Sequence, residues 1–412
     1  MVGRRRLGRQ FGWLWASYAV SAYGSGLGFG ALPLIAVLVL HAGPAEVSAL
    51  SAVGPAVGAL IAVPLAPWVE FRRKRPVMVM MDLARFAAMA TIPVAYAFGC
   101  LSFVQLLVVS AVVAAAKIAF NAASGAYLKA LVRPDDLLVA NARFESTNWS
   151  SIAVGPPLGG AAIGLFGPVT TVVADALSYL LSALGITAIR GQEEAPRTTD
   201  KSPLRAGALL DGWRHIMGHP GLRPLYLNQM LVAGLIMATE PLLAVLLLRQ
   251  LGFPPWQYAL AFAAPCLGGL IGSRLARRVV ARFGRHWVFR TVGTLRAIWL
   301  IGLAFVRPGV VGLVTVMAVE LAIIINMSLY SPVLDRLEHT PKHLVARTLS
   351  AWSIGQQASI AVLTALAGLL ADVTSPRTAL TVAGLLILTT PLLLPRQDQT
   401  SQHEPELSRS HS

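Results

Sequence analysis

The sequence predicts an all-α membrane protein of twelve transmembrane helices, arranged as two pseudo-symmetric six-helix bundles. Three observations lead to this fold class. Apolar runs of about 20 to 30 residues recur along the chain, and a helix needs about 20 residues to cross a bilayer core. Only 13% of the 412 residues are charged, whereas about 25% is usual in a soluble domain. Basic residues gather at the ends of alternate runs, as the positive-inside rule expects.

The predicted spans follow the apolar runs in chain order. The first span comes after the basic cluster Arg4–Arg6 and is too long for the apolar core of a signal peptide. Very short outer loops, such as Gly99–Cys100, force consecutive helices to be antiparallel neighbours. The predicted spans are residues 11–40, 46–69, 76–98, 101–127, 142–166, 168–189, 223–249, 255–280, 287–306, 309–332, 345–371 and 376–395.

The longest connection divides the spans into two sets of six. It begins with a polar, solvated stretch and continues over residues 206–217 as an amphipathic helix on the cytoplasmic face. The polar composition of the last residues predicts disorder. We therefore expect an N-terminal bundle over 1–190, a linker over 191–221, a C-terminal bundle over 222–396 and a disordered cytoplasmic tail over 397–412.

An internal repeat supports two related halves. Lys74-Arg75-Pro-Val precedes Asp82-Leu-Ala-Arg85, and Arg285-His286-Trp-Val precedes Gly293-Thr-Leu-Arg296. Both stretches begin the third helix of their half. Six-helix repeats of this kind are typical of transporters with a site at the membrane midplane between the halves.

The distribution of positive charge orients the chain. With few exceptions, the 34 Lys and Arg residues lie in the tails, in the even-numbered loops or at the helix ends beside them. Both termini are therefore expected in the cytoplasm, and the Arg- and Ala-rich composition suggests a bacterial cytoplasmic membrane. The net charge of +15 does not indicate nucleic-acid binding, because the basic residues are not gathered on one domain. The exceptions are Arg249, Arg307 and Arg377 on the outer side and Arg85, Lys117 and Arg296 within helices.

Five segments carry a family resemblance, in the expected order and at the expected spacings. They are Ala31–Ala36, Leu131–Ala142, Gly155–Gly160, Asp175–Ala183 and Gly368–Asp372. Together they resemble the major facilitator superfamily, and within it bacterial exporters similar to the enterobactin exporter and the macrolide-efflux proteins. The resemblance implies two rocking halves, with the first, fourth, seventh and tenth helices lining a central cavity.

The fifth helix carries a packing motif. Its small residues, Gly155, Gly159 and Gly160, allow close approach of helix backbones. Pro156 and the proline after it remove backbone donors and predict a bend. The resemblance places this bend at the interface of the two halves, and ordinary small-residue packing is the alternative interpretation.

The loop between the second and third helices departs from the pattern of the superfamily. The family pattern is Gly-x-x-x-Asp-Arg-x-x-Arg-Arg, whereas Ala66, Glu70 and Phe71 stand at its first three conserved positions here. The resemblance implies a latch on the inner gate. The alternative is a positive-inside cluster without a latch. The candidate gating residues are Glu70, Lys74, Arg75, Asp82 and Arg85.

Ionisable side chains within spans cost about 2.5–3.5 kcal/mol each on insertion scales and usually mark function. Lys117, Glu240 and Glu320 fall on three of the four helices that the resemblance assigns to the cavity. Asp175 lies on the peripheral sixth helix, so we expect a structural polar role for it. Packing alone, or snorkelling of Lys117 to the interface, is the alternative. Further candidate cavity residues are Tyr18, Tyr23 and Asn326.

These features predict a secondary active transporter that exports a hydrophobic or amphipathic small molecule in exchange for protons. Glu240 or Glu320 would take up the proton, and the charge of Lys117 would tune the carboxylate. An importer and a non-transporting membrane sensor remain alternatives. The expected partners are a small-molecule substrate, a coupling ion (a proton) and membrane lipid, with the protein a monomer that binds no nucleic acid. No motif of an enzyme, a cofactor site or a metal site was found.

Overall fold

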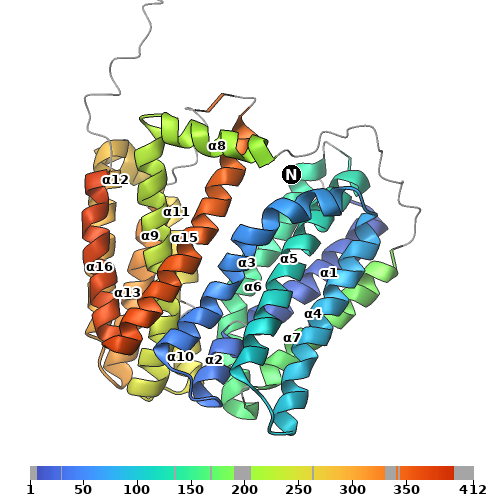
Figure 1. The fold of residues 1–412 in the computed structure, drawn as a ribbon, viewed down its shortest axis with the longest axis horizontal. Coiled ribbons are helices and arrows are strands. Elements are labelled where there is room, and N and C mark those ends of the chain that lie inside the picture. Colours follow the sequence, from blue (N-terminus) through green and yellow to red (C-terminus); the bar gives the residue numbers. More distant parts are fainter. Residues whose placement is uncertain are drawn as a thin grey trace, which may run out of the picture.

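The computed structural model consists of helices gathered into two bundles that stand side by side (Figure 1). It describes residues 7–28, 30–133, 136–167, 169–189, 206–261, 264–329, 340–341 and 344–393. Among these residues no β-strand occurs, and the predicted all-α fold class is confirmed. The first part of the predicted linker and the predicted tail lie outside the described residues.

The N-terminal bundle contains the helices α1 to α7. Helix α1 packs against α6 and α7, and α4 packs against α5 and α7. Helix α5 has a side-chain N-cap: the Ser102 hydroxyl accepts a hydrogen bond from the Gln105 backbone amide (3.2 Å). The bounds are α1 (Arg9–Leu27), α2 (Ala31–Leu38), α3 (Pro44–Glu70), α4 (Lys74–Ala97), α5 (Phe103–Leu131), α6 (Leu137–Phe166) and α7 (Val169–Thr187).

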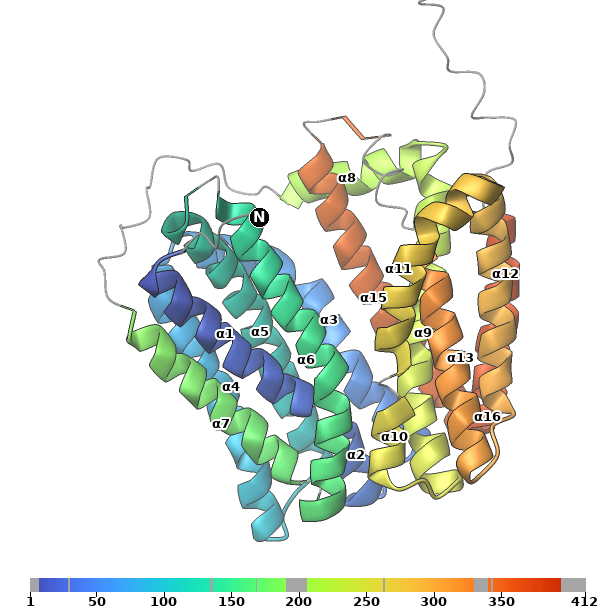
Figure 2. The same ribbon diagram turned by 180° about the vertical axis from the view of Figure 1, so that it is seen from behind.

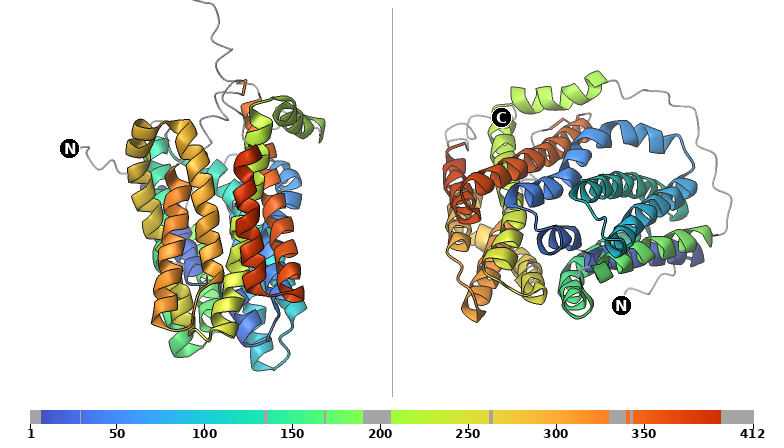
Figure 3. Two further views of the ribbon diagram at one scale, coloured as in Figure 1. Left: turned by 90° about the vertical axis from the view of Figure 1, so that its left-hand side faces the viewer. Right: turned by 60° about the horizontal axis from the view of Figure 1, so that its bottom comes forward.

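The C-terminal bundle follows the helix α8 (Ala206–Gly218), which lies along the outside of this bundle beside α15 (Figure 3). Within the bundle α9 packs against α15, α11 against α13, and α12 against α16. The bounds are α9 (Leu222–Ala244), the π-helix η2 (Val245–Gln250), α10 (Pro255–Ala261), α11 (Ala264–Phe283), α12 (Arg285–Ala304), α13 (Val310–Leu329), α15 (Val345–Val373), α16 (Pro376–Thr389) and η3 (Thr390–Leu393).

Ten helical segments in the described part of the chain are long and apolar enough to cross a membrane. The two other predicted spans, 255–280 and 287–306, fall on α10–α11 and on α12. α11 and α12 pack within the C-terminal bundle, and their arginines lower their apolar character, whereas the short α10 packs mainly against α6. The chain is a multi-pass membrane protein.

The predicted first span, residues 11–40, corresponds to the candidate span Arg9–Leu38, but its helix is interrupted. Helix α1 ends at Leu27 and α2 begins at Ala31, with Gly30 between them in the left-handed conformation (φ 73°). Glycine occupies every second position from Gly24 to Gly30, which weakens a helix because glycine loses the most conformational freedom on folding. Apolar run length alone does not register such a break.

Apolar packing joins the two bundles at one end of the molecule, which we name the α2 side; the opposite end is the α8 side. On the α2 side one cluster of buried residues includes Ile35 of α2, Leu243 of α9 and Tyr258 of α10. On the α8 side each bundle has its own cluster, one containing Phe11 and the other Trp352. In agreement, α3 and α15 converge toward the α2 side (Figure 2).

Candidate functional site

A cavity of about 290 Å³ lies in the N-terminal bundle between α1, α4, α5 and α6. Polar and aromatic side chains share its walls. Lys117, in the middle of α5, is exposed in it. The cavity is lined by Tyr18, Ser21, Ala22, Ser25, Gly26, Arg85, Lys117, Phe120, Asn121, Asn148, Ser151, Ile152 and Pro156.

Arg85 forms the second cationic part of this wall. Its guanidinium pairs with the buried carboxylate of Asp82, one turn earlier on α4. The Arg85 Cζ also lies 4.7 Å from the ring centroid of Phe120 and 4.4 Å from that of Tyr179. Cations over aromatic faces are attracted by the ring quadrupole. The carboxylate and the two rings therefore fix the guanidinium in place.

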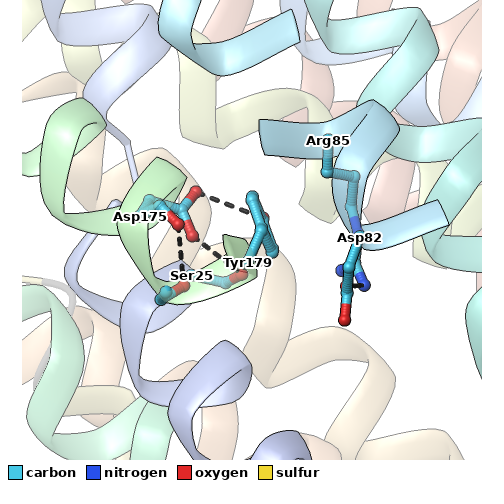
Figure 4. Close-up of polar contacts among 6 residues, drawn as sticks. Ser25, Asp82, Arg85, Asp175 and Tyr179 are labelled. Atoms are coloured by element: carbon cyan, nitrogen blue, oxygen red, sulfur yellow. Dashed lines mark hydrogen bonds and ion pairs between the residues drawn. The ribbon is translucent and has the colours of Figure 1, made fainter. Parts of the chain in front are cut away.

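Behind the cavity, Asp175 of α7 sits in a hydrogen-bonded group with Ser25 and Tyr179 (Figure 4). The Ser25 hydroxyl donates to Asp175 Oδ1 (3.2 Å), and the Tyr179 hydroxyl donates to Asp175 Oδ2 (3.2 Å). The two hydroxyl oxygens lie 2.9 Å apart. Asp175 and Tyr179 share one face of α7 because they are four residues apart.

Lys117 lies near this group rather than near the acidic residues of the other bundle. The charged groups that interact with it electrostatically are Arg85 and Asp175. Within the described part of the chain, its ammonium makes no hydrogen bond and no ion pair. No contact in this structure supports the hypothesis that Lys117 acts on Glu240 or Glu320. Asp175, for which a structural role was expected, is the acid that interacts with Lys117.

A second group of ionisable residues lies in the C-terminal bundle. Glu240 of α9 and Glu320 of α13 interact electrostatically with each other, and both interact with Tyr258 of α10. Both glutamates are partly exposed, and Glu240 shares a face of α9 with the exposed Met237 one turn earlier. The structure thus brings together two of the predicted coupling residues.

Tyr258 was not among the predicted site residues. It begins the second turn of α10 and lies beside Gly30 at the break between α1 and α2, where a Cβ on Gly30 would be 3.6 Å from its ring. Gly28, on the other side of the break, lies against Asp175. The break in the first span therefore stands between the two ionisable groups. In the sequence, the glycine repeat from Gly24 to Gly30 could have indicated this break.

Two of the candidate gating residues, Lys74 and Arg75, contact the ends of two different helices. Lys74 Nζ donates to the carbonyls of Val69 (2.8 Å) and Arg72 (2.7 Å), at the end of α3. Arg75 donates to the carbonyls of Ile186 (3.1 Å) and Thr187 (2.6 Å), at the end of α7. Cations satisfy the free carbonyls of a helix C-terminus.

The other predicted gating residues are Asp82, Arg85 and Glu70. Asp82 and Arg85 pair with each other inside the N-terminal bundle. Glu70 is the last residue of α3, and its side chain lies outside the described part. Lys74 and Arg75 thus contact carbonyls at helix ends, and Asp82 and Arg85 form a pair within one bundle.

Two predicted cavity residues also lie apart from the 290 Å³ cavity, which Tyr18 does line. The Tyr23 hydroxyl is 2.8 Å from the Ser150 hydroxyl in an open groove between α1 and α6. Asn326 is buried in α13, and its backbone carbonyl accepts a hydrogen bond from Arg296 (3.4 Å).

The glycines of α6 lie where helices cross closely. A Cβ on Gly155 would overlap the backbone of Gly26, and one on Gly159 would overlap the Leu27 carbonyl, both in α1. A Cβ on Gly160 would overlap Ala259 of α10, across the interface between the bundles. Small residues at these positions permit the crossings. Pro156 lies inside α6 and lines the cavity.

Comparison with known proteins gives a consistent result. A family model described as Major Facilitator Superfamily matches residues 14–337. YvqJ of Bacillus subtilis (strain 168), described as an uncharacterised MFS-type transporter, is 29% identical over 240 residues, which are 56% of this chain and 54% of that protein. The chain thus spans about half the length of this curated relative.

Two solved structures share the fold. The nucleoside transporter NupG has a TM-score of 0.75 at 10% identity, over 93% of this chain and 98% of NupG. A bacterial homologue of the iron transporter ferroportin, in an inward-facing state, has a TM-score of 0.74 at 16% identity, over 94% of this chain and 98% of that one.

Proposed function

Because the chain belongs to the Major Facilitator Superfamily and is thus a secondary transporter, we propose that it exports an amphipathic small molecule in exchange for protons. The observation that carries the proposal is the pair formed by Glu240 and Glu320. Export, rather than uptake, is favoured by the five segments that resemble bacterial exporters.

The glutamate pair has the chemistry of a coupling site. The two carboxylates, on α9 and α13, interact electrostatically with each other, and no cation in the described part of the chain forms an ion pair with either. Like charges close together in a poorly solvated site repel. A proton bound by the pair removes one negative charge and so lowers the cost of burying the two carboxylates. Protonation therefore favours conformations in which the pair is buried over conformations in which it is exposed to water.

The packing of the bundles supports access to the cavity from the α8 side. The bundles share one apolar cluster on the α2 side and have separate clusters on the α8 side. The positive-inside pattern places the α8 side in the cytoplasm of a bacterial cell. The cargo would enter from the cytoplasm and leave on the α2 side. There the glutamate pair would take up a proton from outside, and the return to the state open on the α8 side would carry that proton inward.

The test is gradient-driven efflux from cells that carry the Glu240→Gln or the Glu320→Gln variant, with a panel of fluorescent amphipathic compounds. We expect both variants to lose efflux against a concentration gradient and to keep downhill exchange. Glu46→Gln is the matched control, because Glu46 is an exposed acid outside the cavity. Wild-type gradient-driven efflux in both variants would reject the coupling role.

Direction and orientation are tested separately. In a deletion strain, higher intracellular compound supports export, lower compound supports uptake, and no change for any compound favours a non-transporting role. Epitope tags on Met1 and Ser412 are expected on the same, cytoplasmic side. Tags on opposite sides would contradict the even number of spans.

A further inference from the structure

We propose that the cargo is an organic anion whose acidic group binds to Lys117 and whose apolar body lies against Phe120 and Tyr18. The proposal rests on the proposed function, because it takes the ligand of the N-terminal cavity to be the transported molecule. It names the chemical class of that molecule, an acid with an aromatic or apolar body.

Lys117 is the first observation. Its ammonium is exposed in the cavity and has no hydrogen bond or ion pair with the described residues. A charge at membrane depth is costly unless it faces water or a partner. A cation held in this way, without a protein partner, is available to an anionic ligand.

The acids near Lys117 are set behind the wall of the cavity. Asp175 is 5% exposed and Asp82 is fully buried, and neither lines the cavity. Both Asp175 oxygens accept from protein donors, the hydroxyls of Ser25 and Tyr179, and Asp82 Oδ1 accepts from the guanidinium of Arg85. The charged side chains among the residues that line the cavity are the cations of Arg85 and Lys117.

Neutral donors stand beside Lys117. The side-chain amides of Asn121 and Asn148 line the same cavity and make no hydrogen bond within the described part of the chain. A carboxylate, sulfonate or phosphate has several acceptor positions, which one ammonium and two amides can satisfy together. A cationic cargo would instead meet two positive charges.

The apolar part of the cavity limits the rest of the ligand. The Phe120 ring, the Tyr18 ring and Ile152 line it together with Pro156. The volume of about 290 Å³ is at the lower end of the range for small-molecule pockets. The acid is therefore expected to carry a compact aromatic or aliphatic body.

The experiment is equilibrium binding to the full-length protein in nanodiscs of phosphatidylcholine, without a proton gradient. The probes are 1-naphthoate, 1-naphthyl phosphate, 1-naphthalenesulfonate and the neutral 1-naphthamide. We expect at least one anion to bind at least tenfold more tightly than the amide. Lys117→Gln should weaken the binding of that anion by about ten- to a hundredfold and leave the affinity for the amide unchanged. Lys117→Arg should keep the preference for the anion.

Lys129→Gln is the matched control, because it removes the same charge from α5 about 18 Å further along the helix. The proposal is overturned if no anion is preferred over the amide in the wild type. It is also overturned if Lys117→Gln weakens anion and amide equally, or if Lys129→Gln removes the preference as fully as Lys117→Gln does.

A second set of nanodiscs, with phosphatidylglycerol added, identifies the source of the anion. Displacement of the probe by this lipid in the wild type but not in Lys117→Gln would make the ligand an anionic lipid. Undisturbed binding would make it a free organic acid. The two proposals can fail separately. If the wild type prefers anions but both glutamate variants keep gradient-driven efflux, the coupling role of the glutamates is rejected and the anion site stands. If the glutamate variants lose gradient-driven efflux but no anion is preferred, the anion site is rejected and the coupling role stands.

Discussion

Gly26 of α1 crosses Gly155 of α6 so closely that a Cβ on Gly155 would overlap the Gly26 backbone. The crossing lies beside the N-terminal cavity, since Gly26 lines it. Helix crossings of this kind depend on small residues, because a membrane provides little hydrophobic driving force between helices. The position of α1, and with it that of Ser25 and Tyr18, depends on this contact.

Gly155→Ala should therefore destabilise the N-terminal bundle. Added atoms in a packed interface usually cost about 1–3 kcal/mol, and the neighbour here is backbone, which has little room to move. The measurement is thermal or denaturant unfolding in detergent. Gly164→Ala, in the same helix with no atom within 4 Å of its Cβ position, is the control. Equal effects of the two substitutions would contradict the close crossing.

Tyr179→Phe should lower stability by about 0.5–2 kcal/mol, because it removes a hydroxyl that donates to Asp175 and lies beside the Ser25 hydroxyl. Unfolding in mixed micelles measures the effect. Tyr96→Phe serves for comparison, since Tyr96 is exposed near the end of α4. A Tyr179→Phe protein as stable as the Tyr96→Phe protein would show that the hydroxyl contributes nothing.

Arg249→Gln should loosen the contact between the bundles on the α2 side. The Arg249 guanidinium, at the end of η2, donates to the carbonyls of His41 (3.3 Å) and Ala42 (3.3 Å) in the N-terminal half. The measurement is the distance between spin labels on the native Cys100 and on Val310→Cys, with Cys266 replaced by Ala. We expect a new population at longer distance.

Arg377→Gln is the control for this experiment. Arg377 also donates to backbone carbonyls, those of Ala304 (2.5 Å) and Val306 (2.8 Å), but both lie in its own bundle. Its loss should leave the distance between the bundles unchanged. If the Arg249→Gln variant has the same distance distribution as the parent protein, the hydrogen bonds of Arg249 to His41 and Ala42 do not hold the α2 side together.

Gly212→Leu should displace α8 from the C-terminal bundle. A Cβ at Gly212 would lie 2.5 Å from the Arg347 carbonyl oxygen, so a larger side chain forces the helix away from α15. The ion pair of Asp211 with Arg347 (3.1 Å) is exposed and too weak to resist this. Faster hydrogen exchange of the α8 amides would report the displacement. Gly218→Leu is the control, because the Cβ position of Gly218 has open space around it. In this variant the α8 amides should exchange at the wild-type rate.

Much of the fold followed from the sequence because bilayer thickness sets the length of a span. The all-α class and the membrane location came from apolar runs of about 20 residues or more. The helix that the amphipathic pattern of residues 206–217 predicted within the linker is α8, Ala206–Gly218. The break at Gly28–Gly30 was missed, because an apolar run gives no information about a change in backbone conformation.

The candidate site was predictable only in part. Lys117, Glu240 and Glu320 stood out because charges in apolar spans are rare. Their partners did not stand out, since Tyr258 and Tyr179 are ordinary residues of apolar helices. The neighbours of a side chain depend on the rotation and crossing of its helix, which packing determines.

By itself, the sequence determined that this chain is a membrane protein and which charges lie within its helices, because water and lipid act on each segment separately. The tertiary structure alone decided which charges meet. It placed Lys117 with Arg85 and Asp175, and Glu240 with Glu320 and Tyr258. Each group forms from three different helices. The way helices cross depends on close packing, as where Gly155 of α6 meets Gly26 of α1, and a single segment of sequence does not contain that information.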